Sequence, residues 1–160
     1  MAVKPIPEGY HSVTPYLMMK RAGEAIEFYK RAFGAVELMR LGGPDGKVGH
    51  AEIRIGDSPV MLADEHPDLG YVGPETLGGA GVSIMLYVED ADAVFQRAVD
   101  AGAEVLKPME NQFYGDRTGT VKDPFGHVWS IGMNVEKLTV EEISARMAAM
   151  MAGGDGQSCG

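Results

Sequence analysis

Residues 25–35 read AIEFYKRAFGA, and this stretch has the pattern of an amphipathic helix. Ile26, Tyr29 and Phe33 recur at helical spacing, which places them on one face. Gly34 follows the last apolar residue and is a typical helix stop. The stretch therefore predicts a helix over residues 21–34 that packs one side against a core.

The flanking residues have strand patterns. Residues 11–19, HSVTPYLMM, are rich in β-branched and aromatic residues, which favours a strand before the helix. After the helix, alternating patterns separated by the turn clusters GGPDG and GD predict three strands, at 35–41, 47–56 and 58–64. The predicted order is strand, helix and three strands.

The same order returns in the second half. The segment AVFQRAVDAGA at 93–103 resembles AIEFYKRAFGA, and its Gly102 lies 68 residues after Gly34. A repeat of this length indicates two copies of one supersecondary unit that share a core or a cavity. We predict a first module at 10–64, a connector at 65–81, a second module at 82–134, a C-terminal helix at 137–152 and a disordered tail at 153–160.

These patterns predict an α+β fold. Two tandem βαβββ modules would form one curved, eight-stranded mixed sheet with helices on its convex face, plus the C-terminal helix. In that helix Thr139 and Glu142 fit a capping box. Its apolar residues could dock on their own domain or on a second subunit, and the pattern is compatible with both.

Composition excludes several classes of function. The chain has 160 residues with 45% hydrophobic content, and none of its apolar runs approaches the ~20 residues of a membrane span. The N-terminus lacks the apolar segment of a secretory signal, so we expect the protein to be cytoplasmic and not to bind a membrane. A net charge of −9 opposes binding to nucleic acid. Cys159, the only cysteine, is expected to form neither a disulfide nor a metal cluster.

Four stretches carry a resemblance to a known family: AIEFYKRAFGA, GHAEIRIGDSPVMLADE, LYVEDADAVFQRAVDAGA and QFYGDRTGTVKDPFGHVW. Across about residues 10–135 the chain resembles the vicinal oxygen chelate superfamily, and most closely its PhnB-like, glyoxalase/bleomycin-resistance-type proteins. The resemblance implies the same βαβββ duplication and a homodimer. It does not imply one reaction, because the superfamily contains isomerases, lyases, dioxygenases, transferases and antibiotic-binding proteins.

The resemblance also implies where a metal would bind. Metal-using members place four His, Glu or Gln ligands on the first and fourth strands of each copy, and these positions fall at Thr14, Met61, Ser83 and Ser130 here. Three hydroxyls and a thioether are poor ligands for Zn, Ni or Fe(II). We therefore expect no metal and no other cofactor.

Strand alternation extends the same face of the sheet. It adds Tyr16 and Met18 on the first strand and Met85 and Tyr87 on the fifth, and we place Tyr114 and Arg117 at the mouth of the cavity. Aromatic rings, thioethers and hydroxyls suit an apolar organic molecule with a polar handle. The same side chains could equally serve as plain filling. The predicted ligand-binding residues are Thr14, Tyr16, Met61, Ser83, Met85, Tyr87, Tyr114, Arg117 and Ser130.

The third strand carries the candidate catalytic pair. If Ala51 and Ile53 face the helices, His50 and Glu52 face the cavity or a subunit interface together with Arg54. A carboxylate beside an imidazole could support proton transfer. Alternatively, Glu52 and Arg54 form an ion pair and His50 is an ordinary hydrogen-bonded residue.

The stretch DPFGHVWSIGM at 123–133 contains a histidine and the only tryptophan. If Ser130 faces the cavity, His127 and Trp129 face the helices. We therefore predict that His127 is a hydrogen-bonded residue beside a turn and that Trp129 belongs to the core.

Three functions follow from these patterns. The first is a metal-free protein that binds a small organic ligand in the sheet cavity. The second is an enzyme of the superfamily, either a lyase, isomerase or dioxygenase with a displaced metal site or an acid–base enzyme that uses His50 and Glu52. The third is a non-catalytic structural dimer with a filled cavity.

Overall fold

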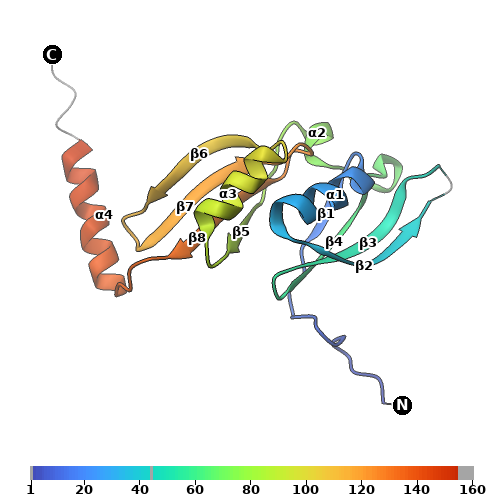
Figure 1. Ribbon diagram of the computed structural model, residues 1–160, viewed down its shortest axis with the longest axis horizontal. Coiled ribbons are helices and arrows are strands. Elements are labelled where there is room, and N and C mark those ends of the chain that lie inside the picture. Colours follow the sequence, from blue (N-terminus) through green and yellow to red (C-terminus); the bar gives the residue numbers. More distant parts are fainter. Residues whose placement is uncertain (1, 44, 155–160) are drawn as a thin grey trace.

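The computed structural model describes residues 2–43 and 45–154. The first module contains β1 (Tyr16–Met19), α1 (Ala22–Phe33), β2 (Val36–Gly42), β3 (Val48–Ile55) and β4 (Ser58–Asp64). The second contains β5 (Ser83–Tyr87), α3 (Ala91–Asp100), β6 (Glu104–Asn111), β7 (Asp116–Lys122) and β8 (Val128–Asn134). This order confirms the predicted pair of βαβββ modules in an α+β fold (Figure 1).

Two further segments complete the described chain. Between the modules, the connector forms the 3-10 helix η1 (Pro67–Leu69) and the short helix α2 (Pro74–Leu77). After the second module comes α4 (Val140–Gly154), which opens with the predicted capping box, since Glu142 N donates to Thr139 Oγ1 at 3.2 Å. The helix reaches two residues into the predicted tail, and residues 155–160 lie outside the described part.

The sheet differs from the prediction in one respect. The strands form two four-stranded sheets, ordered β1-β4-β3-β2 and β5-β8-β7-β6, in place of one continuous sheet of eight strands. In each sheet the first strand pairs parallel with the fourth and the other pairs are antiparallel. β1 and β5 are edge strands of the two sheets, and residues of both line one cavity at the seam between the modules.

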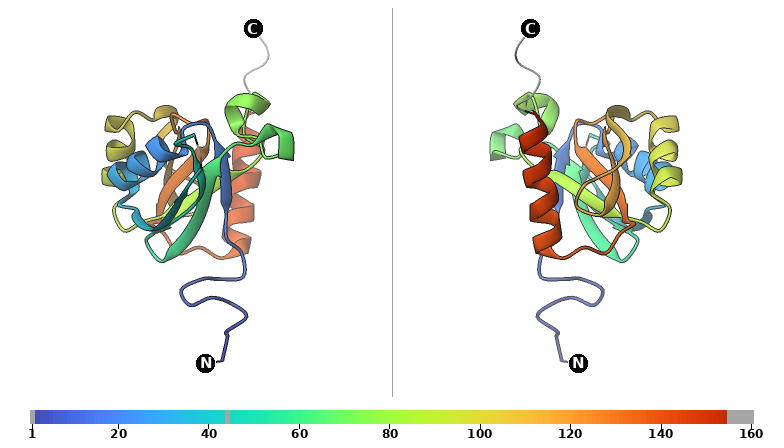
Figure 2. Two further views of the ribbon diagram at one scale, coloured as in Figure 1. Left: turned by 90° about the vertical axis from the view of Figure 1, so that its right-hand side faces the viewer. Right: turned by 90° about the vertical axis from the view of Figure 1, so that its left-hand side faces the viewer.

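The helices α1 and α3 lie side by side and cover the same face of both sheets (Figure 2). Their buried residues join the inward side chains of the strands in one core that draws on both modules. The opposite, concave face carries no helix of the modules; the connector and α4 lie on that side of the molecule (Figure 2). Within the described residues, none of the helices is long and apolar enough to cross a bilayer.

A buried aspartate joins the two modules. Asp123, in the turn between β7 and β8, accepts hydrogen bonds from the Tyr29 hydroxyl of α1 at 2.6 Å and from Trp129 Nε1 at 2.9 Å. It also accepts from the backbone amides of Phe125 and His127. Burial, together with the negative charge of Asp123, raises the pKa of Tyr29 well above its ordinary value. The turn is thus fixed against the first helix.

Trp129 itself is 1% exposed, and its ring lies 4.7 Å from that of Phe33. This confirms the prediction that the tryptophan belongs to the core. The neighbouring concave positions of β8 are therefore the ones available to a site.

Candidate functional site

The concave face of the first sheet carries a row of side chains from three strands. The register pairs Tyr16 of β1 with Met61 of β4, and Met61 with Glu52 of β3. Ala51 and Ile53, the neighbours of Glu52, are completely buried on the helix side. The alternation predicted for β3 is therefore right, and His50 and Glu52 lie on the concave face.

A chain of hydrogen bonds runs along this row. The Tyr16 hydroxyl lies 2.9 Å from His50 Nδ1, and His50 Nε2 lies 3.1 Å from Glu52 Oε1. Tyr10, from the segment before β1, donates its hydroxyl to the other oxygen of Glu52. The rings of Tyr16 and His50 meet edge to face at 5.4 Å. Four polar side chains thus hold one another in place.

The chemistry of the chain fixes its direction. A carboxylate oxygen accepts, so in the neutral ring Nε2 of His50 carries the proton and Nδ1 accepts from the tyrosine hydroxyl. Glu52 then orients the imidazole, and the imidazole orients the hydroxyl of Tyr16. Glu52 bonds to His50 and Tyr10 rather than to Arg54, contrary to the alternative of an ion pair on this strand.

One cavity lies along the seam between the modules. It has a volume of about 610 Å³ and is walled by β1, β5 and the connector. Most of its lining is aliphatic, with Tyr16, Ser83 and Met85 among the predicted ligand-binding residues. A cavity of this size and polarity accommodates a small organic molecule.

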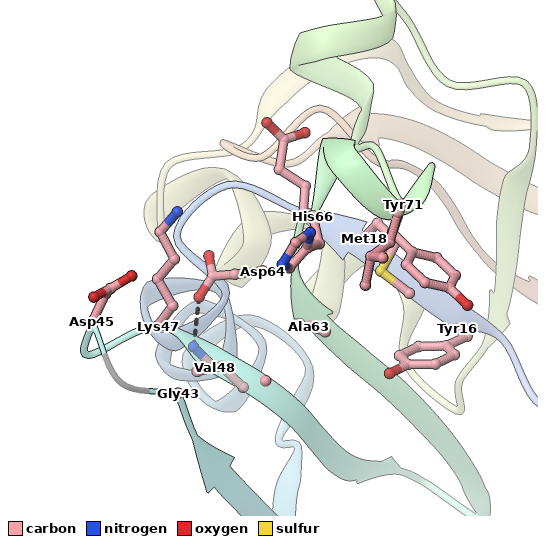
Figure 3. Close-up of a pocket in the computed structure, with 13 residues that line it drawn as sticks. Tyr16, Met18, Gly43, Asp45, Lys47, Val48, Ala63, Asp64, His66 and Tyr71 are labelled. Carbon is pink, nitrogen blue, oxygen red and sulfur yellow. Dashed lines mark hydrogen bonds between the residues drawn. The ribbon is translucent and has the colours of Figure 1, made fainter.

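A second cavity of about 430 Å³ opens on the other side of β1 (Figure 3). Tyr16 and Met18 line both cavities. The second cavity is more polar: Lys47, Asp64 and His66 contribute to it, and Tyr71 faces it from the connector. Tyr16 therefore stands where the two cavities and the hydrogen-bond chain meet.

Asp64 in this cavity has a structural task. Its carboxylate accepts from the amide of Ala22 at 3.0 Å, at the start of α1, and from the amide of Val48 at 2.7 Å. The carboxylate thus caps a helix whose preceding residue, Arg21, offers no side-chain cap. The same aspartate also fixes the beginning of β3.

A third cavity, of about 530 Å³, lies along the same seam and includes Met85 and Tyr87. The hydroxyl of Tyr87 donates to Asp116 Oδ2 at 2.6 Å. This hydrogen bond is the main reason why the pKa of Tyr87 is raised. Tyr87 is thus held at one end of the second sheet.

Other predicted residues lie outside these cavities. Thr14 precedes β1; Met61 stands beside Tyr16; and the hydroxyl of Ser130 lies 3.1 Å from that of Thr120. Tyr114 packs edge-on against Phe113 in the turn after β6.

Arg117 is not brought to the site at all. Its guanidinium makes two hydrogen bonds of 2.7 Å to Asp92 of α3, on the helix side of the sheet. The ion pair lowers the pKa of Asp92. Arg117 therefore does not lie at the cavity mouth as predicted, because Asp92 in the first turn of α3 binds its guanidinium on the helix side.

The positions implied for metal ligands do not fit a metal. The register pairs Met61 with Tyr16 and Ser130 with Met85, so Thr14 and Ser83 each come two residues before the residue that faces Met61 or Ser130, and Thr14 lies outside β1. Neutral hydroxyls and thioethers are weak ligands for the divalent ions of this chemistry. Within residues 2–43 and 45–154, no three His, Cys, Asp or Glu side chains are grouped to hold an ion.

His127 has the structural role predicted for it, with one addition. Its Nε2 lies 2.9 Å from the carbonyl oxygen of Met18, which joins β8 to the edge of β1. The ring nevertheless lines the seam cavity. Strand alternation did not predict that His127 lines this cavity, because the residue stands just before β8, where side chains do not yet alternate between the two faces.

Sequence reasoning also missed Tyr10, His66 and Tyr71. These residues come from irregular segments, whose side-chain directions follow no period. The only signal available was their residue type, an aromatic or imidazole ring, which for Tyr10 and His66 stands close to a predicted strand.

Comparison with known proteins agrees with the fold. Residues 10–131 match the Glyoxalase/Bleomycin resistance protein/Dioxygenase superfamily. An uncharacterised protein of Mycobacterium tuberculosis is 48% identical over 148 residues, which cover 91% of this chain and 85% of the relative.

Two solved structures are similar as well. TioX from Micromonospora sp. ML1 has 26% identity and a TM-score of 0.61, with 78% of this chain and 99% of that chain covered. The PhnB protein from Bacillus cereus is similar in fold, with 20% identity, a TM-score of 0.61 and coverage of 78% and 99%. Together with the duplicated modules, these matches show that the chain belongs to the glyoxalase/bleomycin resistance protein/dioxygenase superfamily.

Proposed function

We propose that this protein binds a small, largely apolar organic molecule around Tyr16, without a metal ion. One observation carries the proposal: Tyr16 lines both cavities and is hydrogen-bonded to His50. The aliphatic seam would hold the body of the ligand, and the tyrosine hydroxyl would meet its polar group. Ser83, Met85 and His127 would complete the contacts.

Volume supports binding over a purely structural role. Ligand sites in proteins span about 300–1,000 Å³, and the seam cavity falls within this range. A structural dimer with a filled cavity would instead have its methionines and tyrosines close-packed, because interiors leave few voids larger than a water molecule. The open cavity along the seam therefore supports ligand binding over a structural dimer with a filled cavity.

A second function is favoured by the hydrogen-bond chain itself. If the ligand is a substrate, the Tyr16 hydroxyl could take a proton from it while passing its own proton to Nδ1 of His50, with Glu52 holding the other side of the ring. In that case His50→Ala abolishes turnover while ligand binding persists. Full turnover in that variant would remove His50 from the mechanism.

The ligand proposal is tested by a thermal-shift screen of neutral aromatic compounds. A compound at 100 times its Kd stabilises the protein by about 2.7 kcal/mol. Tyr16→Phe should reduce the shift, and Tyr71→Phe, which alters only the smaller cavity, should leave a seam-bound ligand unaffected. If no compound shifts the melting temperature, or if Tyr16→Phe has no effect, the proposed site is wrong.

The absence of a required metal is tested separately. The protein is expressed in medium supplemented with Ni, Zn, Fe and Mn, purified, and analysed for bound metals by mass spectrometry. A stoichiometric, tightly held ion would contradict the proposal and favour the metal-dependent lyase, isomerase or dioxygenase.

The proposal further includes a homodimer that works in the cytoplasm, as the sequence and its family resemblance led us to expect.

A further inference from the structure

The C-terminal helix α4 has no packing partner within its own chain. None of its described residues is buried, although the helix has 15 residues. In Figure 1 it stands apart at one end of the molecule. Its length alone does not explain its stability, since isolated helices of about 12–15 residues are marginal in water. The helix therefore needs a partner surface.

Only the first half of α4 is anchored. Arg146 bonds to Glu136 at 2.8 Å and to the carbonyl oxygen of Phe113 at 3.3 Å. Leu138, just before the helix, lies beside Gly115. These contacts fix the direction of the helix and leave its second half, from Met147 onward, away from the modules.

A stripe of apolar side chains runs along α4 from its anchored start into its free half. Val140, Ile143, Met147 and Met150 follow one another at intervals of three or four residues, so they share one side of the helix. Met147 and Met150 are 51% and 60% exposed. Methionine side chains adapt to irregular apolar surfaces and are frequent where proteins dock. Alanines at 145 and 149 lie on the opposite side.

A matching uncovered surface exists on the same chain. The concave face of the sheets is not covered by α1 or α3, and it exposes large apolar side chains: Tyr16, Met39, Leu41, Met85 and Tyr87. Leu41 and Met39 pair with His50 and Glu52 in the register, so they belong to the concave face. Figure 2 shows α4 on this side of the molecule. The anchored start holds α4 off the concave face of its own chain.

The exposed area points to a second copy as the partner. A folded monomer of this size is expected to expose about 7,800 Å². The chain exposes 10088 Å². The excess is roughly 2,300 Å², and although the N-terminal segment supplies part of it, it exceeds the ~800 Å² that each partner buries in a standard interface.

We infer that α4 of one copy packs its methionine stripe on the concave face of a second copy, and that the second copy returns its own α4 in the same way. Such a reciprocal exchange gives a closed two-fold dimer in which both uncovered surfaces are satisfied. The partner's helix then forms one wall above the face that carries Tyr16. The inference shares the homodimer with the proposed function but concerns the ligand-free protein, so it does not depend on the proposed ligand site.

The assembly is tested by light scattering after size-exclusion chromatography. Wild-type protein should have twice the mass of the chain. A double variant, Met147→Glu with Met150→Glu, should be a monomer, whereas the matched control, Ala145→Glu with Ala149→Glu, should remain a dimer. Circular dichroism checks that both variants keep their folded modules. A monomeric wild type, or a dimer that survives the stripe substitutions, would overturn the inference.

The docking surface is located by paramagnetic relaxation between copies. A spin label is attached to Met151→Cys in a Cys159→Ser background, and the labelled chain is mixed with ¹⁵N-labelled copies. Amides of β3 and β4 should broaden in the ¹⁵N-labelled copies. Broadening confined to α4 would show helix–helix pairing instead and would contradict the docking on the concave face.

Discussion

The hydroxyl of Tyr16 lies 2.9 Å from Nδ1 of His50, across the intervening strand β4. This contact joins two groups of residues that sequence reasoning had kept apart, the ligand-binding set and the candidate catalytic pair. Glu52 Oε1 lies 3.1 Å from Nε2 on the other side of the imidazole, so Glu52 orients the ring and the ring orients the tyrosine hydroxyl. A ligand at Tyr16 therefore meets an oriented polar group.

The first prediction concerns the tautomer of His50. With Glu52 accepting from Nε2, the neutral ring should carry its proton on Nε2. Long-range ¹H–¹⁵N spectra distinguish the two tautomers directly. Glu52→Gln should weaken the preference, whereas Arg54→Gln, two residues along the same strand, should not. A ring protonated on Nδ1 in the wild-type protein would contradict the direction of the chain.

The second prediction concerns Asp123. This side chain is 2% exposed and accepts four hydrogen bonds. Asp123→Ala leaves four donors without their acceptor, and it should lower the free energy of unfolding by about 3–5 kcal/mol. Denaturant unfolding measures this loss. Asp57→Ala, in an exposed turn, should change stability by no more than about 0.5 kcal/mol. Equal effects of the two substitutions would show that Asp123 does not join the modules.

The third prediction is an alkaline loss of stability from Tyr29. Its pKa is raised in the folded state, so its contribution is complete below the ordinary tyrosine pKa of about 10 and is lost as pH rises through the folded value. Above pH ~10 the unfolded chain loses the proton first, which costs about 1.4 kcal/mol per pH unit. Unfolding curves at pH 8 and 11 should show this slope in the wild type. In Tyr29→Phe the slope should be smaller; an unchanged slope would mean that Tyr29 does not contribute.

The fourth prediction concerns the connector. A Cβ added at Gly73 would lie 2.7 Å from Met19 Cα and 2.8 Å from the carbonyl oxygen of Met18. Both are backbone atoms of β1, so Gly73→Ala should displace the connector and destabilise the protein by about 1–3 kcal/mol. Gly81→Ala is the control, because open space surrounds that position. If the two variants have the same melting temperature, the connector is not held tightly against β1.

Much of the fold could be predicted because both modules combine a helical period with strand alternation. The buried faces of α1 and β3, the capping box at Thr139 and the core position of Trp129 all follow from such periods. The break between β1 and β5 could not be predicted, since strand patterns do not show which edges meet. Arg117 was misplaced because its partner Asp92 is distant in sequence and packs from another layer. The role of Tyr16 was predicted only in part, because its hydrogen bond to His50 reaches from β1 across β4 to β3.

Binding around Tyr16 without a metal is the central claim, and an NMR titration tests it most directly. Metal-free, ¹⁵N-labelled protein is titrated with a neutral aromatic compound selected by thermal shift, in the presence of a chelator. We predict saturable shifts at Tyr16, Met18, Ser83, Met85 and His127, the residues around the seam. No shifts at these residues, or shifts that arise only after a divalent metal is added, would contradict the account.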